Sequence, residues 1–118
     1  MKNSSLLGRT RFSLNGWSTA WRSEGSLRLH VAVSLVAMAA LAMAGASAWW
    51  LAVVAFAVAA CWAVELLNAA IEALCDTLHP EHHPGIGATK DIASAAAFTV
   101  NMGLFVLVAL ALYVALQP

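Results

Sequence analysis

Two carboxylates and an amide follow a long apolar run, in the segment ELLNAAIE at residues 65–72. Ionisable side chains are costly inside a membrane, and where they occur there they mark a functional site by default. A helix turns about 100° per residue, so one sector of roughly 80° holds four polar side chains: Glu65, Asn68, Glu72 and Asp76. The segment therefore predicts a single polar stripe on an otherwise apolar helix, which marks a candidate functional site.

The composition is that of a membrane protein. Of the 118 residues, 62% are hydrophobic and 10% are charged, whereas about a quarter of the residues of a soluble domain are charged. We expect an all-α integral membrane protein, one membrane domain over residues 1–118, with three transmembrane helices and an N-terminal amphipathic surface helix. The expected bounds are 5–25 for the surface helix, 27–45 for the first span, 48–78 for the second span with a cytoplasmic extension, and 88–116 for the third span.

The surface helix is expected because apolar and basic residues separate onto two sides of it. Leu14, Trp17 and Trp21 recur at spacings of three and four, which places them on one face, with the tryptophans at headgroup depth.

A loop between the second and third spans is expected because residues 79–87 contain several helix breakers. The residues expected to interrupt the helix there are His79, Pro80, His83, Pro84, Gly85 and Gly87.

The basic residues set the expected orientation. Most of them precede the first span, one precedes the last span, and the turn at 45–50 has no charge: Lys2, Arg9, Arg11, Arg22 and Arg28, then Lys90. The positive-inside rule therefore places the N-terminus and the loop at 77–90 in the cytoplasm. We expect no signal peptide, because the first apolar run begins late and lacks a clear cleavage site.

Three carboxylates are candidates for chemistry. Glu65 lies a heptad deeper than Glu72, where a low dielectric would raise its pKa and suit it to accept a proton. The alternative is a structural carboxyl paired with Asn68 or with Asn101 of the third span. Glu24 and Glu72, if they lie at one depth, would jointly hold a divalent cation, and carboxylates with water suit Mg²⁺.

The remaining polar residues are less specific. Cys61 and Cys75 lie in or beside apolar helix and are expected to be buried packing residues. The histidines of the loop at 79–85 have irregular spacing, which favours a solvated loop over a metal site. A lysine in the pair Lys90-Asp91 would suit phosphate, although it also satisfies the topology. The sequence has no phosphate-binding loop of the soluble nucleotide-binding proteins.

Three motifs together resemble the prokaryotic diacylglycerol kinase family, the small trimeric integral-membrane lipid kinases. They are AWRSE at 20–24 with Arg28, ELLNAAIEA at 65–73, and ATKDIASAA at 88–96. Asp76 and the histidine-containing loop lie between the second and third motifs, and the likeness covers essentially the whole chain.

The resemblance implies an enzyme of the bacterial cytoplasmic (inner) membrane that uses ATP to phosphorylate the hydroxyl of diacylglycerol at the cytoplasmic interface. The product would be phosphatidic acid. The enzyme would be a homotrimer whose subunits share active sites, with a membrane lipid as substrate and no nucleic acid partner. By the same resemblance, Glu65 is the catalytic base, and Glu24 and Glu72 are the Mg²⁺ ligands.

The resemblance also implies further contacts, position by position. The ATP-binding residues would be Arg9, Phe12, Glu24, Glu72, Glu81, His82, His83, Lys90 and Asp91. The lipid-binding residues would be Glu65, Asn68, Ser94 and Arg28, with Asp76 as a supporting polar residue. The sequence departs from the family near its start: the family arginine corresponds to Arg9 or Arg11 only with a gap, and Phe12 replaces a tyrosine of the best-known members.

Two alternatives remain open. A close relative phosphorylates undecaprenol with the same polar residues, and His30 favours it, because a histidine is familiar there in such relatives and the best-known diacylglycerol kinase has a glutamate. The other is a non-enzymatic oligomer that conducts protons or ions along Glu65, Asn68 and Glu72. That alternative leaves Glu24 and the Lys90-Asp91 pair unexplained.

Overall fold

The computed structural model describes residues 5–118, and this part of the chain is helical with no strand. The helices are α1 (Leu6–Ser23), α2 (Gly25–Met43), α3 (Ala48–Leu78) and α4 (Pro84–Ala115). Three of them, α2, α3 and α4, are long and apolar enough to cross a membrane. The all-α prediction with three apolar spans is thus confirmed. Lys2, which contributes to the expected orientation, lies outside the described residues.

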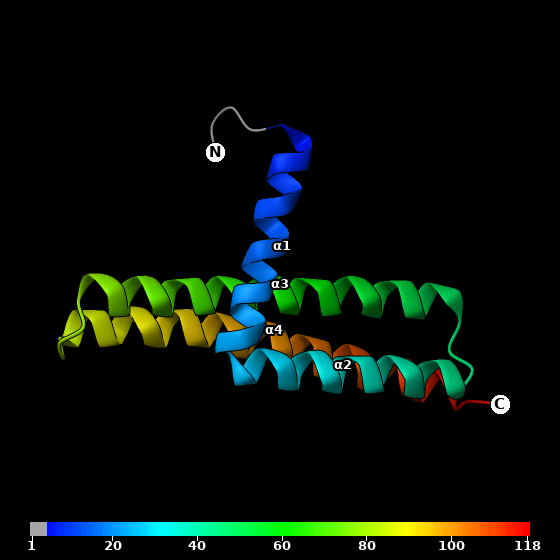
Figure 1. The fold of residues 1–118 in the computed structure, drawn as a ribbon. Helices are drawn as coiled ribbons and strands as arrows, with labels where there is room; N and C mark the ends of the chain where they lie inside the picture. The colour runs from blue at the N-terminus through cyan, green and yellow to red at the C-terminus, as the bar shows by residue number, and fades with distance from the viewer. Residues whose placement is uncertain (1–4) are drawn as a thin grey trace.

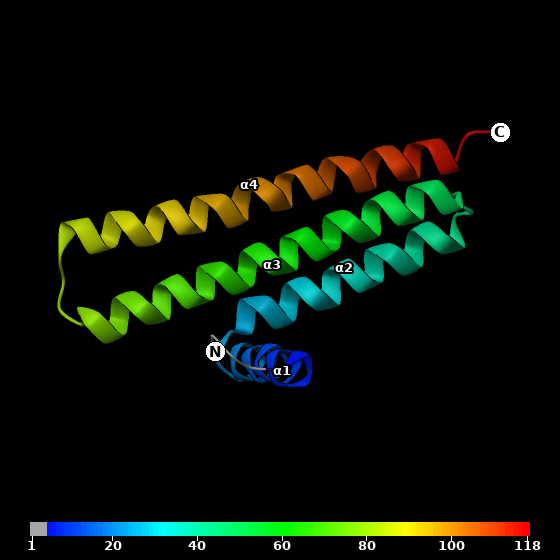
Figure 2. The same ribbon diagram turned by 90° about the horizontal axis from the view of Figure 1, so that it is seen from above.

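The three apolar helices lie side by side, and α1 crosses them (Figure 1). Helix α3 packs against both α2 and α4 and runs antiparallel to each of them. Helix α1 stands across the long axis of the bundle and is viewed nearly end-on in Figure 2. Since α3 has 31 residues, it is about 46 Å long and exceeds a hydrocarbon core of about 30 Å. One end of the α3–α4 hairpin therefore extends beyond the core.

The break between α1 and α2 falls at Glu24, whose backbone is extended (φ −110°, ψ 100°). Arg28, one turn into α2, reaches back across this break. Its guanidinium donates to the carbonyl of Trp21 and, at 3.3 Å, to that of Arg22. These carbonyls lie at the end of α1 and have no partner within that helix, so Arg28 caps α1 and fixes the corner.

A second contact holds α1 to the bundle. The ring of Trp17 meets that of Trp62 of α3 edge-to-face, with centroids 5.9 Å apart. Trp17 is half-buried, while Leu14 and Trp21 are exposed. Trp17 therefore joins α1 to α3 through an aromatic contact, and its expected position at headgroup depth stays a prediction.

The apolar core lies at the end of the bundle opposite the α3–α4 loop. Leu41, Val54, Val58 and Ala111 are buried together there, one or two from each apolar helix. Cys61 and Cys75 are also buried and unbridged, as expected. Most large apolar side chains elsewhere are exposed, and they cover α2, α3 and α4 on their outer faces. Such surfaces suit lipid or a neighbouring subunit.

Helix α4 begins at Pro84, earlier than the start at 88 expected from the sequence. Pro84 and the glycines after it therefore belong to the first turns of the helix and do not interrupt it. Proline is well suited to the first position of a helix, because the N–H that it lacks would have no partner there. His83 caps this end: its Nδ1 accepts from the N–H of Gly85 at 3.0 Å.

The turn from α2 to α3 depends on one glycine. Gly45 has φ +83°, and it ends α2 with two backbone hydrogen bonds: Ala46 N to Leu41 O at 3.0 Å and Gly45 N to Ala42 O at 3.1 Å. This pattern is a Schellman motif, which requires the left-handed conformation at the glycine.

We expect Gly45→Ala to lower the free energy of unfolding by about 1–2 kcal/mol, since a side chain disfavours that conformation. Thermal unfolding in detergent would measure the loss. Gly103→Ala is the matched control, because Gly103 is helical and a Cβ there meets no atom within 4 Å. Equal stabilities of the two variants would show that the turn does not depend on Gly45.

Candidate active site

Glu65 is buried where α2, α3 and α4 meet. Its side chain is 6% exposed, and its Oε1 accepts a hydrogen bond from Asn101 Nδ2 of α4 at 2.9 Å. The second amide hydrogen of Asn101 goes to the carbonyl of Ala97 at 2.8 Å, so this amide is held in place. Of the two structural partners expected for Glu65, the structure selects Asn101.

His30 of α2 approaches the same carboxylate oxygen. Its Nδ1 lies 2.7 Å from Glu65 Oε1. This nitrogen is buried, and the ring orientation is not that of a hydrogen bond. The distance is thus that of a hydrogen bond, whereas the orientation of the ring is not. We interpret the pair from its distance, because a rotation of the ring would align Nδ1 with the carboxylate oxygen. Glu65 therefore has a neighbour from each of the other two spans.

The other residues of the polar stripe differ in how deeply they are buried. Asn68 is half-buried and its Oδ1 is buried without a hydrogen bond. Glu72 is half-buried. Asp76, at the exposed end, pairs with Lys90 of α4 at 2.5 Å. The expected polar stripe is therefore present, and it runs from a buried carboxylate to an ion pair that joins α3 and α4.

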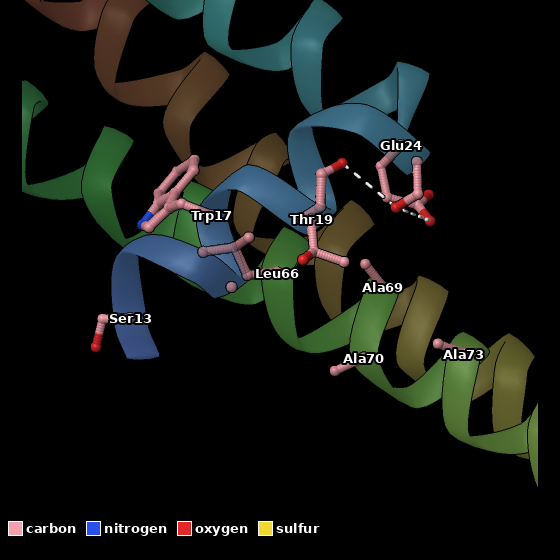
Figure 3. A pocket seen from close by; sticks show the side chains of 11 residues that line it. Ser13, Trp17, Thr19, Glu24, Leu66, Ala69, Ala70 and Ala73 are labelled. Atoms are coloured by element: carbon pink, nitrogen blue, oxygen red, sulfur yellow. Dashed lines mark hydrogen bonds between the residues drawn. The ribbon is translucent and has the colours of Figure 1, made fainter. Parts of the chain in front are cut away.

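Glu24 lies in a cleft between α1 and α3, with a volume of about 570 Å³ (Figure 3). Trp17 and Ala20 form part of the α1 wall. The α3 wall is made of small or apolar side chains: Leu66, Ala69, Ala70 and Ala73. Glu72 is not among the residues that line this cleft, so the cleft contains only one of the two expected metal ligands.

The two expected metal ligands do not form a complete metal site by themselves. Over residues 5–118, no three or more His, Cys, Asp or Glu side chains gather as a metal-binding group. The chemistry of the two half-buried carboxylates nevertheless suits Mg²⁺, which is usually bound by one or two carboxylates and keeps water or phosphate oxygens as its other ligands.

The α3–α4 loop forms a second, polar pocket of about 330 Å³. Its lining includes several of the expected nucleotide contacts and the Asp76–Lys90 pair: Asp76, Glu81, His82, His83 and Lys90. The rings of His79 and His83 lie 5.2 Å apart, and His83 also caps α4. The structure thus brings the loop residues to Lys90, at the exposed end of the polar stripe.

Several expected site residues lie away from these groups. Arg9 and Phe12 are exposed on α1, and Asp91 and Ser94 are exposed on α4. Arg28 is engaged by the end of α1, which is a structural contact and differs from the lipid contact expected for it. The structure of one chain therefore assembles the centre of the predicted site and leaves its outer members on the surface.

His30 is not among the site residues predicted from the sequence. The sequence relates it only to the choice of lipid acceptor, although it is a polar residue near the start of an apolar helix. The same signal that identifies Glu65, a polar group inside an apolar run, also applies to His30 and Asn101. Their meeting at one oxygen required the packing of three helices.

The arrangement defines a class of protein: a helical membrane protein with a buried carboxylate, a cleft that contains a second carboxylate, and a polar loop pocket farther along the same helix. Comparison with known proteins agrees. Residues 11–113 match the sequence profile described as prokaryotic diacylglycerol kinase. Arg9 lies ahead of the matched residues, whereas Phe12 lies within them.

Two curated relatives carry the same name. The diacylglycerol kinase of Pseudomonas aeruginosa is 38% identical over 97 residues, which cover 79% of this chain and 76% of the relative. The diacylglycerol kinase of Haemophilus influenzae is 28% identical over 93 residues, which cover 79% of each protein. The chain belongs to the prokaryotic diacylglycerol kinase family and is a membrane-embedded lipid kinase. The non-enzymatic, ion-conducting alternative is therefore wrong.

Proposed function

We propose that this protein transfers the γ-phosphoryl group of ATP to the hydroxyl of diacylglycerol, giving phosphatidic acid at the cytoplasmic face of the membrane. The observation that carries the proposal is the geometry of Glu65, a buried carboxylate with one oxygen engaged and the other without a hydrogen bond among residues 5–118. The name of the two relatives supports diacylglycerol as the acceptor.

Glu65 performs the proton transfer in this mechanism. Its Oε1 is held by Asn101, so Oε2 is the oxygen that accepts the proton of the lipid hydroxyl. The hydroxyl oxygen then bonds to the γ-phosphorus as the bond from that phosphorus to the bridging oxygen of ADP breaks. The proton remains on Glu65 until it is released, and the products are the phosphorylated lipid and ADP. Phosphoryl transfer depends chiefly on positioning and charge neutralisation.

Charged side chains around Glu65 would position the nucleotide. Glu24 and Glu72 would hold Mg²⁺, which when bound neutralises charge on the phosphates. Lys90, at the end of the polar stripe, would bind phosphate, and the loop with Glu81 and His82 lies in the same pocket. Asp76 orients Lys90 by its ion pair, and this is its supporting role.

A homotrimer would complete the site. The exposed apolar faces of the bundle are available for contact between subunits. Arg9, Phe12, Asp91 and Ser94, exposed in a single chain, would contribute where a neighbouring chain closes the cleft. The distribution of basic residues supports an orientation in the inner membrane with the N-terminus in the cytoplasm.

Undecaprenol is the second candidate acceptor. The observation that favours it is His30, which contacts Glu65 directly and stands where the best-known diacylglycerol kinase has a glutamate. The chemistry at Glu65 is the same for either alcohol, because each acceptor presents a single hydroxyl.

The first test is transfer of labelled γ-phosphate from Mg-ATP in detergent micelles, with diacylglycerol and undecaprenol offered in parallel. We expect strong labelling of diacylglycerol. Labelling of undecaprenol alone would keep the mechanism and change the acceptor. No labelling of either lipid by an assembled protein would contradict the proposal.

Glu65→Gln should lower turnover by at least about a hundredfold, because the amide cannot accept the proton. Nucleotide affinity and thermal stability should change little, since the amide keeps an oxygen for Asn101. Initial rates at saturating ATP and lipid, together with nucleotide titrations, separate the two effects. Wild-type turnover in this variant would remove Glu65 as the base.

Glu24→Gln and Glu72→Gln should each raise the Mg²⁺ concentration for half-maximal activity by about tenfold or more, because each removes a charged ligand. Thr77→Val is a control on α3. Thr77 is exposed and donates to the carbonyl of Ala73 within its own helix, so its loss should leave the Mg²⁺ dependence unaltered. An unchanged dependence in both glutamine variants would reject the metal assignment.

A further inference from the structure

We propose that His30 is a positioning residue for Glu65: its Nδ1–H donates a hydrogen bond to Glu65 Oε1, which fixes the orientation of the carboxylate. The inference rests on the proposed function, in which Glu65 is the base. It concerns a residue from a different helix, which the sequence motif around Glu65 does not contain.

The distance requires a proton between the two groups. Two atoms with facing lone pairs repel one another at 2.7 Å, the separation of Nδ1 and Oε1. A carboxylate only accepts hydrogen bonds, and a neutral histidine has one nitrogen that donates and one that accepts. The carboxylate therefore selects the tautomer with hydrogen on Nδ1. No other partner competes for this buried nitrogen among the described residues.

Two donors then converge on one oxygen of Glu65. Asn101 approaches from α4 and His30 from α2, and both reach Oε1. A carboxylate held at one oxygen cannot rotate freely, so the other oxygen keeps a fixed direction. Hydrogen bonds to charged groups are shorter and about twice as strong as neutral ones. His30 therefore positions the base and does not itself touch the lipid hydroxyl.

The side chain of His30 is 37% exposed and lines a groove of about 220 Å³ between α2 and α4. Asn101 lines the same groove, so the two side chains that approach Glu65 Oε1 border one space.

Two substitutions separate the hydrogen bond from the shape of the ring. His30→Asn places an amide donor where Nδ1 was, and His30→Phe keeps a ring of similar shape without a donor. We expect His30→Phe to lower kcat about tenfold to a hundredfold, the loss typical of a hydrogen bond to a charged group. The KM for ATP should be unchanged.

The Asn variant carries the decisive measurement. It should retain kcat within a few-fold of wild type, because its amide donates where Nδ1 does. Rescue by a smaller side chain that donates, where a ring without a donor fails, is not expected of a residue that only fills space. All variants are compared at one pH with the same Mg-ATP and lipid.

The results distinguish the inference from the function on which it rests. Wild-type kcat in His30→Phe, or a kcat in His30→Asn as low as that of His30→Phe, would overturn the positioning role while phosphoryl transfer by the wild type continues. An inactive wild type would overturn both. If His30→Phe fails to assemble, His30→Ala replaces it as the variant without a donor.

Discussion

The burial of one carboxylate between apolar helices is the constraint on which this structure depends. A charge removed from water is tolerated only where hydrogen bonds or opposite charges replace the lost solvation. Here the replacement comes from α2 and α4, through His30 and Asn101. The three spans therefore have to meet at the depth of Glu65, and the register of the bundle follows from that requirement as much as from its apolar packing.

The apolar core and the polar site residues lie at different positions along the length of the bundle. The buried core around Leu41 and Val54 lies at the end near the α2–α3 turn, where no catalytic group is needed. The polar loop and the Asp76–Lys90 pair lie at the other end. Glu65 lies between them, close enough to the core to be held rigidly and close enough to the polar end to be reached by substrates.

Much of this could be predicted from the sequence, because it depends on local periodicity. The three apolar runs, the stripe from Glu65 to Asp76 and the family motifs are all visible in the order of residues. The contacts of Arg28 and His30 are not, because each depends on how two helices cross. The start of α4 at Pro84 was also missed, since proline and glycine break a helix in its interior but are accepted in its first turn.

The corner at Glu24 has a geometric consequence. Helix α2 has 19 residues, so it is about 28 Å long, close to the thickness of a hydrocarbon core. It begins beside Glu24 and ends at the Gly45 turn, and Arg28 locks its first turn to α1. Helix α2 thus holds the Glu24 carboxylate about one bilayer core away from the Gly45 turn. The depth of the cleft in the membrane is therefore set by the length of α2 and not by the surrounding lipid.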